Sequence, residues 1–135
     1  MKKFILSGLI LLFMSTLMSN GQTAKKETRS AESVKVEAFY FHLTSRCVTC
    51  MAVEAEAKKD LESLYGDKVT FQAINIEDDA SKVITEKLKI SGQTLLLVKG
   101  GTQINITNEG FMYARNNPEK FKSIIKAKVD GLLKL

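Results

Sequence analysis

Both cysteines of this chain lie where an apolar, strand-like run gives way to a helical pattern. Residues 34–43 begin with alternating apolar residues and become continuously apolar, which is typical of a strand in the middle of a sheet. From residue 48 to residue 64 the apolar positions recur at helical spacing. Cys47 and Cys50 therefore fall in the first turn of the expected helix, where free backbone N–H groups and the helix dipole favour a thiolate.

Strands and helices continue to alternate after this helix. Clean alternation at residues 69–76 predicts a second strand, and three acids at 77–79 open a helix that continues to about residue 89. The remaining segments are an apolar strand at 94–98, a tight turn at 100–101, an antiparallel partner strand at 103–107, a turn at 108–110 and a last helix starting at Pro118.

This order predicts an α/β domain at residues 34–135. Two parallel strands joined through helices, then a hairpin and a terminal helix, form a central mixed sheet of four to five strands flanked by helices on both faces. Residues 22–33 are polar and lack large apolar side chains, so we expect a flexible leader before the domain.

The first 21 residues have the pattern of a secretory signal peptide. Lys2 and Lys3 precede an apolar run at 4–18, and small residues at 19–21 offer a cleavage site. The run is short for a membrane span, although an uncleaved membrane anchor is the alternative. We therefore expect export to the periplasm or another extracytoplasmic compartment.

The net charge argues against a nucleic-acid partner. It falls from +5 to +3 when residues 1–21 are removed, because they hold Lys2, Lys3 and no acid. The remaining excess is small and scattered, unlike a nucleic-acid surface. We expect a monomer that binds no nucleic acid.

The spacing of the two cysteines favours redox chemistry over a structural staple. Disulfides persist in exported proteins, but a bridge between Cys47 and Cys50 closes a very short loop and constrains the unfolded chain weakly. A redox-active pair, a site for a metal or metalloid, and an inert disulfide all remain open. A Cys-x-x-Cys without a following histidine argues against attached haem.

Four local matches give this chain a family resemblance. Cys47-Val48-Thr49-Cys50 follows the first strand, residues 73–77 form a strand followed by an acid, residues 88–101 form a loop, a strand and a turn, and Gly110 precedes the last helix. In this order, residues 34–133 resemble the thioredoxin family. The resemblance implies a thioredoxin-like fold and the activity of a thiol–disulfide oxidoreductase.

The chain also departs from the family pattern. Arg46 replaces the usual tryptophan, and Val48-Thr49 replaces the Gly-Pro between the cysteines. Gln93 stands where the family has a cis-proline, so we expect a trans peptide there, because a non-proline cis bond costs about 3–4 kcal/mol. The family's buried acid falls near Tyr40 or Phe41. Because the family's proline helps to keep metals off the thiols, its loss makes a metal more plausible.

The resemblance assigns roles to several residues. Cys47 would attack a disulfide and Cys50 would resolve the mixed disulfide. The charge of Arg46 would favour the Cys47 thiolate. Gln93 and Thr94 would support the site, with the Gln93 amide either binding a partner's backbone or filling a turn. The substrates would be protein disulfides or dithiols, the electrons would come from a membrane-embedded dithiol carrier or another thioredoxin-like protein, and no cofactor beyond the redox-active disulfide is needed.

Other interpretations of the cysteine pair and of the residues near it stay open. His42 could complete a three-ligand site with Cys47 and Cys50 for copper, zinc or arsenite, or be a strand-end side chain without a chemical role. Met51 is a possible Cu(I) ligand, although its spacing favours packing. Residues 111–113 either border the site or pack as a final strand or loop, and the charged runs at 54–62 and 120–128 read as solvated helix faces. An adaptor that uses the fold alone is a third function.

Overall fold

The computed structural model describes residues 34–135, so the predicted signal segment at 1–21 and leader at 22–33 lie outside the described residues. The described part is an α/β domain, as predicted. Its strands and α-helices are β1 (Val36–His42), α1 (Val48–Tyr65), β2 (Val69–Asn75), α2 (Lys82–Leu88), β3 (Thr94–Lys99), β4 (Thr102–Asn105), α3 (Thr107–Tyr113) and α4 (Pro118–Leu133). Short 3-10 turns precede β2 at Gly66–Lys68 and α2 at Asp79–Ser81.

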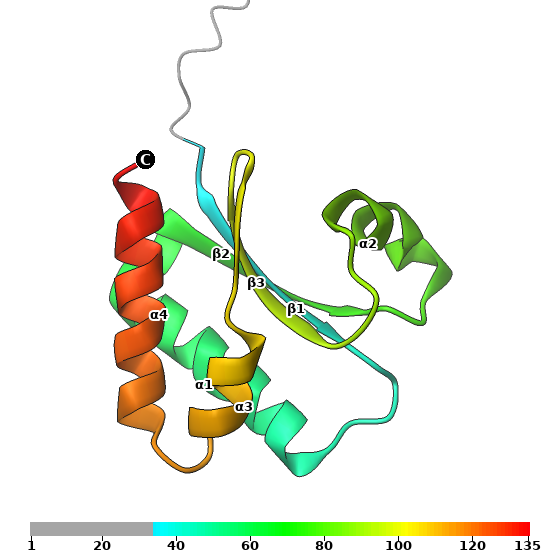
Figure 1. Cartoon of the computed structure of the whole chain (residues 1–135), viewed down its shortest axis with the longest axis horizontal. Helices are drawn as coiled ribbons and strands as arrows, with labels where there is room; N and C mark the ends of the chain where they lie inside the picture. The colour runs from blue at the N-terminus through cyan, green and yellow to red at the C-terminus, as the bar shows by residue number, and fades with distance from the viewer. Residues whose placement is uncertain (1–33) are drawn as a thin grey trace, which may run out of the picture. The chain divides into compact units, whose positions relative to one another are not determined.

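The four described strands form one mixed sheet in the order β2-β1-β3-β4 (Figure 1). β1 pairs in parallel with β2 and antiparallel with β3, and β4 completes a hairpin with β3. The predicted parallel pair and hairpin are therefore confirmed. β1 lies inside the sheet because both of its edges are paired, which explains why its residues are almost continuously apolar.

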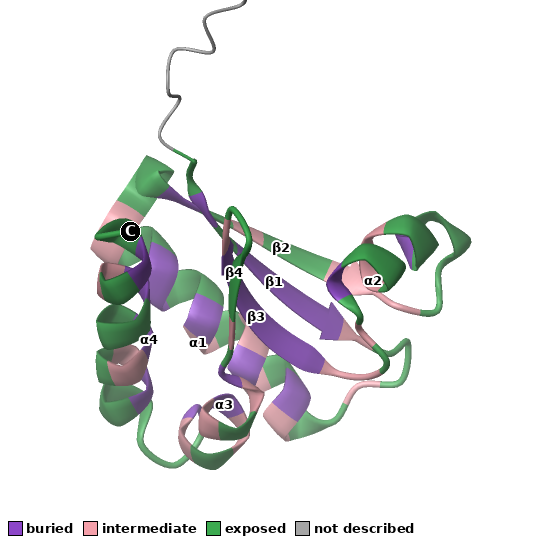
Figure 2. Ribbon diagram, turned by 45° about the horizontal axis from the view of Figure 1, so that its top comes forward, coloured by how far each residue is buried: buried purple, intermediate pink, exposed green. Residues whose placement is uncertain are grey.

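Two hydrophobic cores lie on the two faces of this sheet. Alternate residues of a strand point to opposite faces, so β1 supplies both cores. On one face Val36, Ala38 and Tyr40 pack with apolar residues of α1, α3 and α4. On the other face, Phe39 and Phe41 pack with a smaller set that includes residues of α2 and β3. Figure 2 shows buried residues along β1 and β3 and on the helix sides that face them.

The two long helices begin and end where local signals predict. The Cys47 side chain caps the start of α1, and Gly66, with φ of +52°, ends it. At α4 the Asn117 side chain accepts from the backbone N–H of Lys120, and Pro118 occupies the first turn, where its missing N–H costs nothing. Among the helices of residues 34–135, none is both long and apolar enough to cross a membrane.

The turn predicted at residues 108–110 is wrong, because this segment lies in α3. Asn105 Oδ1 accepts hydrogen bonds from the backbone N–H and the hydroxyl of Thr107, at 3.0 and 2.6 Å, where the helix begins. Gly110 is buried, and a Cβ there would lie 2.9 Å from Cγ1 of Val53. The glycine is needed for the close approach of α3 to α1, not for a turn. Residues 111–113, expected in a strand or loop, are helical as well.

The prediction that residues 54–62 form a solvated charged face is wrong at two positions. Asp60 is only 1% exposed, and its Oδ2 atom has no hydrogen-bond partner. Glu54 forms an ion pair with Arg46 and is about three-quarters buried. Asp60 follows Val53 by seven residues and Ala57 by three, so it lies on the buried side of α1, whereas Glu54 pairs with Arg46, which lies outside the helix.

Candidate functional site

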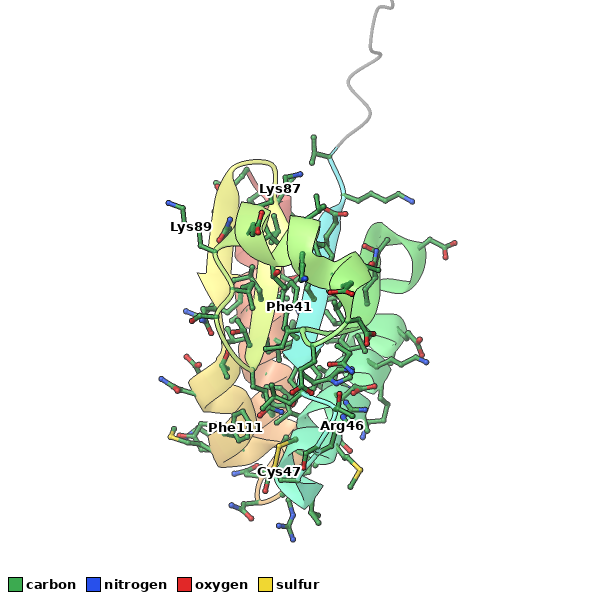
Figure 3. All side chains as sticks on the ribbon, turned by 90° about the vertical axis from the view of Figure 1, so that its right-hand side faces the viewer. Phe41, Arg46, Cys47, Lys87, Lys89 and Phe111 are labelled. Carbon is green, nitrogen blue, oxygen red and sulfur yellow. A yellow bond between two sulfur atoms is a disulfide. The ribbon has the colours of Figure 1, made fainter. Side chains whose placement is uncertain are left out.

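Cys47 and Cys50 form a disulfide at the start of α1, with their Cα atoms 5.0 Å apart. Cys47 is exposed, whereas Cys50 is 5% exposed. Figure 3 shows Cys47 at the lower edge of the molecule, below Arg46. One cysteine is therefore open to solvent while the other is covered by protein, an asymmetry compatible with stepwise disulfide exchange.

The first turn of α1 directs a backbone donor at the exposed sulfur. The N–H of Cys50 donates a hydrogen bond to Cys47 Sγ at 3.0 Å, and the N–H of Met51 donates to the Cys47 carbonyl oxygen at 3.0 Å. No acidic side chain lies in this first turn to oppose a negative charge. In the reduced protein the same N–H group and the helix dipole would stabilise a Cys47 thiolate.

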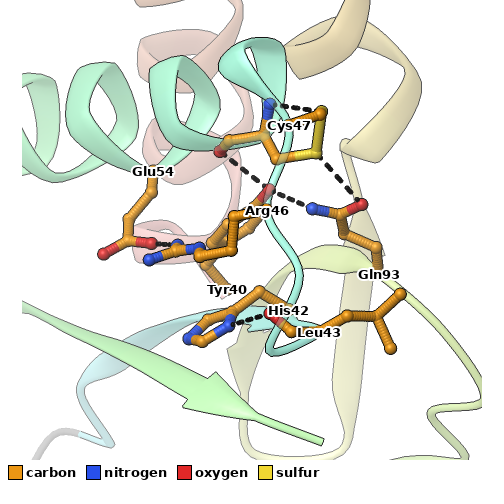
Figure 4. Close-up of a disulfide and its surroundings, with 8 residues drawn as sticks. Tyr40, His42, Leu43, Arg46, Cys47, Glu54 and Gln93 are labelled. Atoms are coloured by element: carbon orange, nitrogen blue, oxygen red, sulfur yellow. Dashed lines mark hydrogen bonds and ion pairs between the residues drawn. A yellow bond between two sulfur atoms is a disulfide. The ribbon is translucent and has the colours of Figure 1, made fainter.

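Tyr40 and Gln93 lie beside the covered sulfur (Figure 4). The Tyr40 hydroxyl donates to the backbone oxygen of Cys50 at 2.9 Å and accepts from Gln93 Nε2 at 2.8 Å. Gln93 Oε1 lies 3.5 Å from Cys50 Sγ, a contact without a hydrogen bond, because a disulfide sulfur carries no proton. Burial raises the pKa of Tyr40, opposed by the Gln93 hydrogen bond and the Arg46 charge. Gln93 is thus beside the sulfurs, as expected from its position.

Arg46 pairs with an acid on α1. Its guanidinium forms an ion pair with Glu54, and both side chains are about three-quarters buried. The arginine is also close enough to Tyr40 for its charge to lower the pKa of the hydroxyl. Its effect on Cys47 stays a prediction. The Glu54 partner was missed because a loop residue and a residue two helical turns later share no local pattern.

Residues at the end of β2 and just after it form hydrogen bonds with the loop that leads to Cys47. The backbone N–H of Thr44 donates to Glu77 Oε2 at 2.6 Å, and Asn75 Nδ2 donates to the Thr44 hydroxyl at 2.9 Å. The hydrogen bonds from Thr44 lower the pKa of Glu77. The acid after this strand is visible in the sequence, but its partner is not, since 33 residues separate the two in the chain.

The structure does not place His42 with the two cysteines as a three-ligand metal site. His42 Nδ1 lies 2.9 Å from the carbonyl oxygen of Leu43 (Figure 4). Nowhere in residues 34–135 are three or more His, Cys, Asp or Glu side chains placed to hold a metal ion. Met51, whose spacing favours packing over metal binding, is 48% exposed on the first turn of α1.

Thr94 has a local structural contact. It is buried at the start of β3, and its hydroxyl donates to the Gly92 carbonyl oxygen at 3.0 Å. The described residues contain no cis peptide bond, which confirms the trans geometry expected at the Gln93 position. Together, the cysteine pair, Tyr40 and Gln93 define an α/β protein with a half-covered disulfide at a helix start.

Comparisons with known proteins add little to this description. No family model matches the chain, and no curated protein matches it. One solved structure, titled "Structure of a malarial protein", is similar over 51% of this chain and 74% of that chain, with 23% sequence identity and a TM-score of 0.41. A likeness of this size carries no argument about fold or function.

Proposed function

We propose that this protein is an exported thiol–disulfide oxidoreductase with a thioredoxin-like fold, which exchanges the Cys47–Cys50 dithiol and disulfide with protein partners. The observation that carries the proposal is the disulfide at the start of α1 between the exposed residue Cys47 and the buried residue Cys50. The mixed sheet with helices on both faces supports the fold assignment. The signal-like segment at 1–21 supports export.

The exchange proceeds in two balanced steps. In the reduced protein the Cys47 thiolate attacks one sulfur of a partner disulfide, forming a mixed disulfide and releasing the first partner thiolate. Cys50 then gives its proton to that thiolate and attacks Cys47 Sγ, which releases the second partner sulfur as a thiolate that takes a proton from water. The protein is oxidised by two electrons and the partner is reduced by two. The reverse sequence oxidises a partner dithiol.

The surface around Cys47 suits a protein partner. Leu43, Val48 and Met51 flank Cys47 in the chain and are 39%, 61% and 48% exposed. Exposed apolar side chains in the segments on either side of a reactive cysteine suit a surface that contacts another protein. The electron donor for reduction would be a membrane-embedded dithiol carrier or another thioredoxin-like protein.

An inert disulfide is a poorer explanation of the same geometry. The bridge spans a sequence separation of three, so it removes little freedom from the unfolded chain. The helix start is already stabilised by backbone hydrogen bonds from Cys50 and Met51. A bridge with so little structural effect at an exposed position is better suited to reversible exchange.

A second candidate is capture of a soft metal ion or metalloid such as arsenite by the reduced pair. The observation that favours it is the exposed Met51 thioether, which follows Cys47 by four residues and so lies on the same side of the first turn. His42 is engaged with its neighbour's carbonyl group and is not part of this set.

Two variants test the leading proposal. The Cys50→Ser variant leaves Cys47 free, and we expect it to accumulate mixed disulfides with protein substrates, visible by mass spectrometry. The Cys47→Ser variant should show neither mixed disulfides nor reduction of a protein disulfide by a dithiol donor. Full exchange activity in Cys47→Ser, or none in wild type with any dithiol, would contradict the proposal. Native mass spectrometry of reduced protein tests the second candidate, because a bound metal must disappear in Cys47→Ser.

A further inference from the structure

The orientation of the Gln93 amide is determined by its neighbours. The Tyr40 hydroxyl has one proton, and it is donated to the backbone oxygen of Cys50 at 2.9 Å. Toward Gln93 the hydroxyl oxygen can therefore only accept, so the group 2.8 Å away must be the Nε2 donor. The other amide atom, Oε1, is then the one that faces Cys50 Sγ at 3.5 Å.

This arrangement matters when the disulfide is reduced. A carboxamide oxygen accepts hydrogen bonds but cannot donate one, so it binds a thiol S–H and repels a thiolate. Cys50 is also covered by protein, which disfavours its charged form. Cys47 has the opposite environment, because it is exposed and receives the Cys50 N–H at 3.0 Å.

The charged groups around Cys47 and Cys50 do not alter this difference between the environments of the two sulfurs. Arg46 in the loop before α1 is paired with Glu54 on α1, so the two charges largely offset each other. On β1, the imidazole of His42 lies beside the Tyr40 ring, with centroids 6.2 Å apart, and points its Nδ1 at Leu43. Tyr40 itself is neutral near pH 7, because the ordinary pKa of a tyrosine is 10.0 and burial raises the pKa of this hydroxyl further.

We propose that Gln93, held in one orientation by Tyr40, is a positioning residue that keeps Cys50 as a thiol while Cys47 carries the thiolate. This inference rests on the proposed exchange function, in which Cys47 attacks first. Gln93 then points into the protein at the resolving sulfur and does not reach out to a partner. After the mixed disulfide has formed, the Cys50 proton leaves Gln93 Oε1 for the released partner thiolate, and Cys50 attacks Cys47 Sγ.

The test measures how the reactivity of Cys50 depends on pH. In a Cys47→Ser background Cys50 is the only cysteine, so the rate of iodoacetamide alkylation against pH gives the midpoint of its ionisation. The plateau at high pH reports accessibility separately. We expect Gln93→Ala to lower this midpoint by about one pH unit, because water can then donate to the sulfur. An unchanged midpoint would overturn the inference.

Three further variants in the same background separate positioning from general loosening of the fold. Tyr40→Phe frees the amide to turn its Nε2 toward the sulfur, so it should also lower the midpoint, and no shift would overturn the role of Tyr40. Gln93→Glu keeps an acceptor oxygen and adds negative charge, so it should raise the midpoint. If Gln93 had only a structural role, Gln93→Ala and Gln93→Glu would shift the ionisation midpoint of Cys50 in the same direction. Tyr65 lies at the far end of α1, and its hydroxyl donates to Asp130 on α4. Tyr65→Phe removes this hydroxyl and should leave the ionisation midpoint of Cys50 unchanged.

The outcome is separable from that of the proposed function. If the midpoints shift as expected but two-cysteine wild type exchanges with no disulfide, the positioning role stands and the oxidoreductase assignment falls. If wild type exchanges disulfides but Gln93→Ala leaves the midpoint unchanged, only the positioning role falls.

Discussion

The Tyr40 hydroxyl on β1 donates a hydrogen bond to the backbone oxygen of Cys50 at 2.9 Å, which joins the centre of the sheet to the first turn of α1. Tyr40 is completely buried among the core residues of that face. A buried hydroxyl without a partner would cost about 1–3 kcal/mol, so this bond both satisfies the tyrosine and fixes the helix start. The first turn of α1, which carries the disulfide, is therefore joined directly to the buried core of the fold.

The close approach of α3 to α1 predicts opposite results for two glycine substitutions. Gly110→Ala places a Cβ 2.9 Å from Val53 Cγ1, so we expect a loss of about 1–3 kcal/mol in the free energy of unfolding. Gly131→Ala in α4 meets no atom within 4 Å, so it should stabilise by about 0.5–1 kcal/mol. Urea unfolding of both variants checks this, and a tolerated Gly110→Ala would contradict the close packing of α3 against α1.

Because the carboxyl group of Asp60 is buried, replacing it should stabilise the protein, and by an amount that depends on pH. Burial raises the pKa of Asp60, so the folded protein binds its proton more tightly than the unfolded chain does. Stability is therefore lost as pH rises from the ordinary value of 3.8 through the raised pKa. We expect Asp60→Asn to stabilise by about 1 kcal/mol near pH 7 and to have no such advantage at low pH. Unfolding curves at several pH values test this, with the exposed Asp67→Asn as control.

The bond between Glu77 and Thr44 predicts acid-sensitive ordering of the loop before Cys47. Thr44 hydrogen bonds lower the pKa of Glu77, so their contribution is present above the ordinary value of 4.5 and is lost as pH falls through the lowered pKa. We expect Glu77→Gln to reduce the protection of the Thr44 amide from hydrogen exchange, measured by NMR. Glu86→Gln, on the exposed side of α2, is the control, and equal protection in all three proteins would refute the anchoring role.

The backbone conformation at the end of α2 predicts that a glycine at position 89 would stabilise the protein. Lys89 has φ of +58°, a left-handed conformation in which a side chain is strained and glycine is not. Lys89→Gly should raise the free energy of unfolding by up to about 1 kcal/mol. Lys87→Gly, two residues earlier inside the helix, should lower it by about 1 kcal/mol. Thermal unfolding distinguishes the two, and a loss in both would show that Lys89 is not strained.

Much of the fold was predictable because its signals are local. The alternation in β2, the helical spacing in α1 and α4, Gly66 and Pro118 each act within a few residues, so a sequence pattern detects them. The mixed sheet followed from the order of these elements. α3 was missed because Gly110 reads as a turn residue unless its contact with Val53 is known, and that contact joins segments almost sixty residues apart.

The amino-acid sequence by itself determined that two thiols stand at the start of a helix in an α/β domain, because strand and helix periods and caps depend on near neighbours. Only the tertiary structure decided which sulfur is covered, that Asp60 is buried, that Arg46 pairs with Glu54, and that the Gln93 oxygen faces Cys50. These features depend on contacts between different elements of the fold. Gln93 and Cys50 are 43 residues apart in the chain and meet only when β1, β3 and α1 pack together.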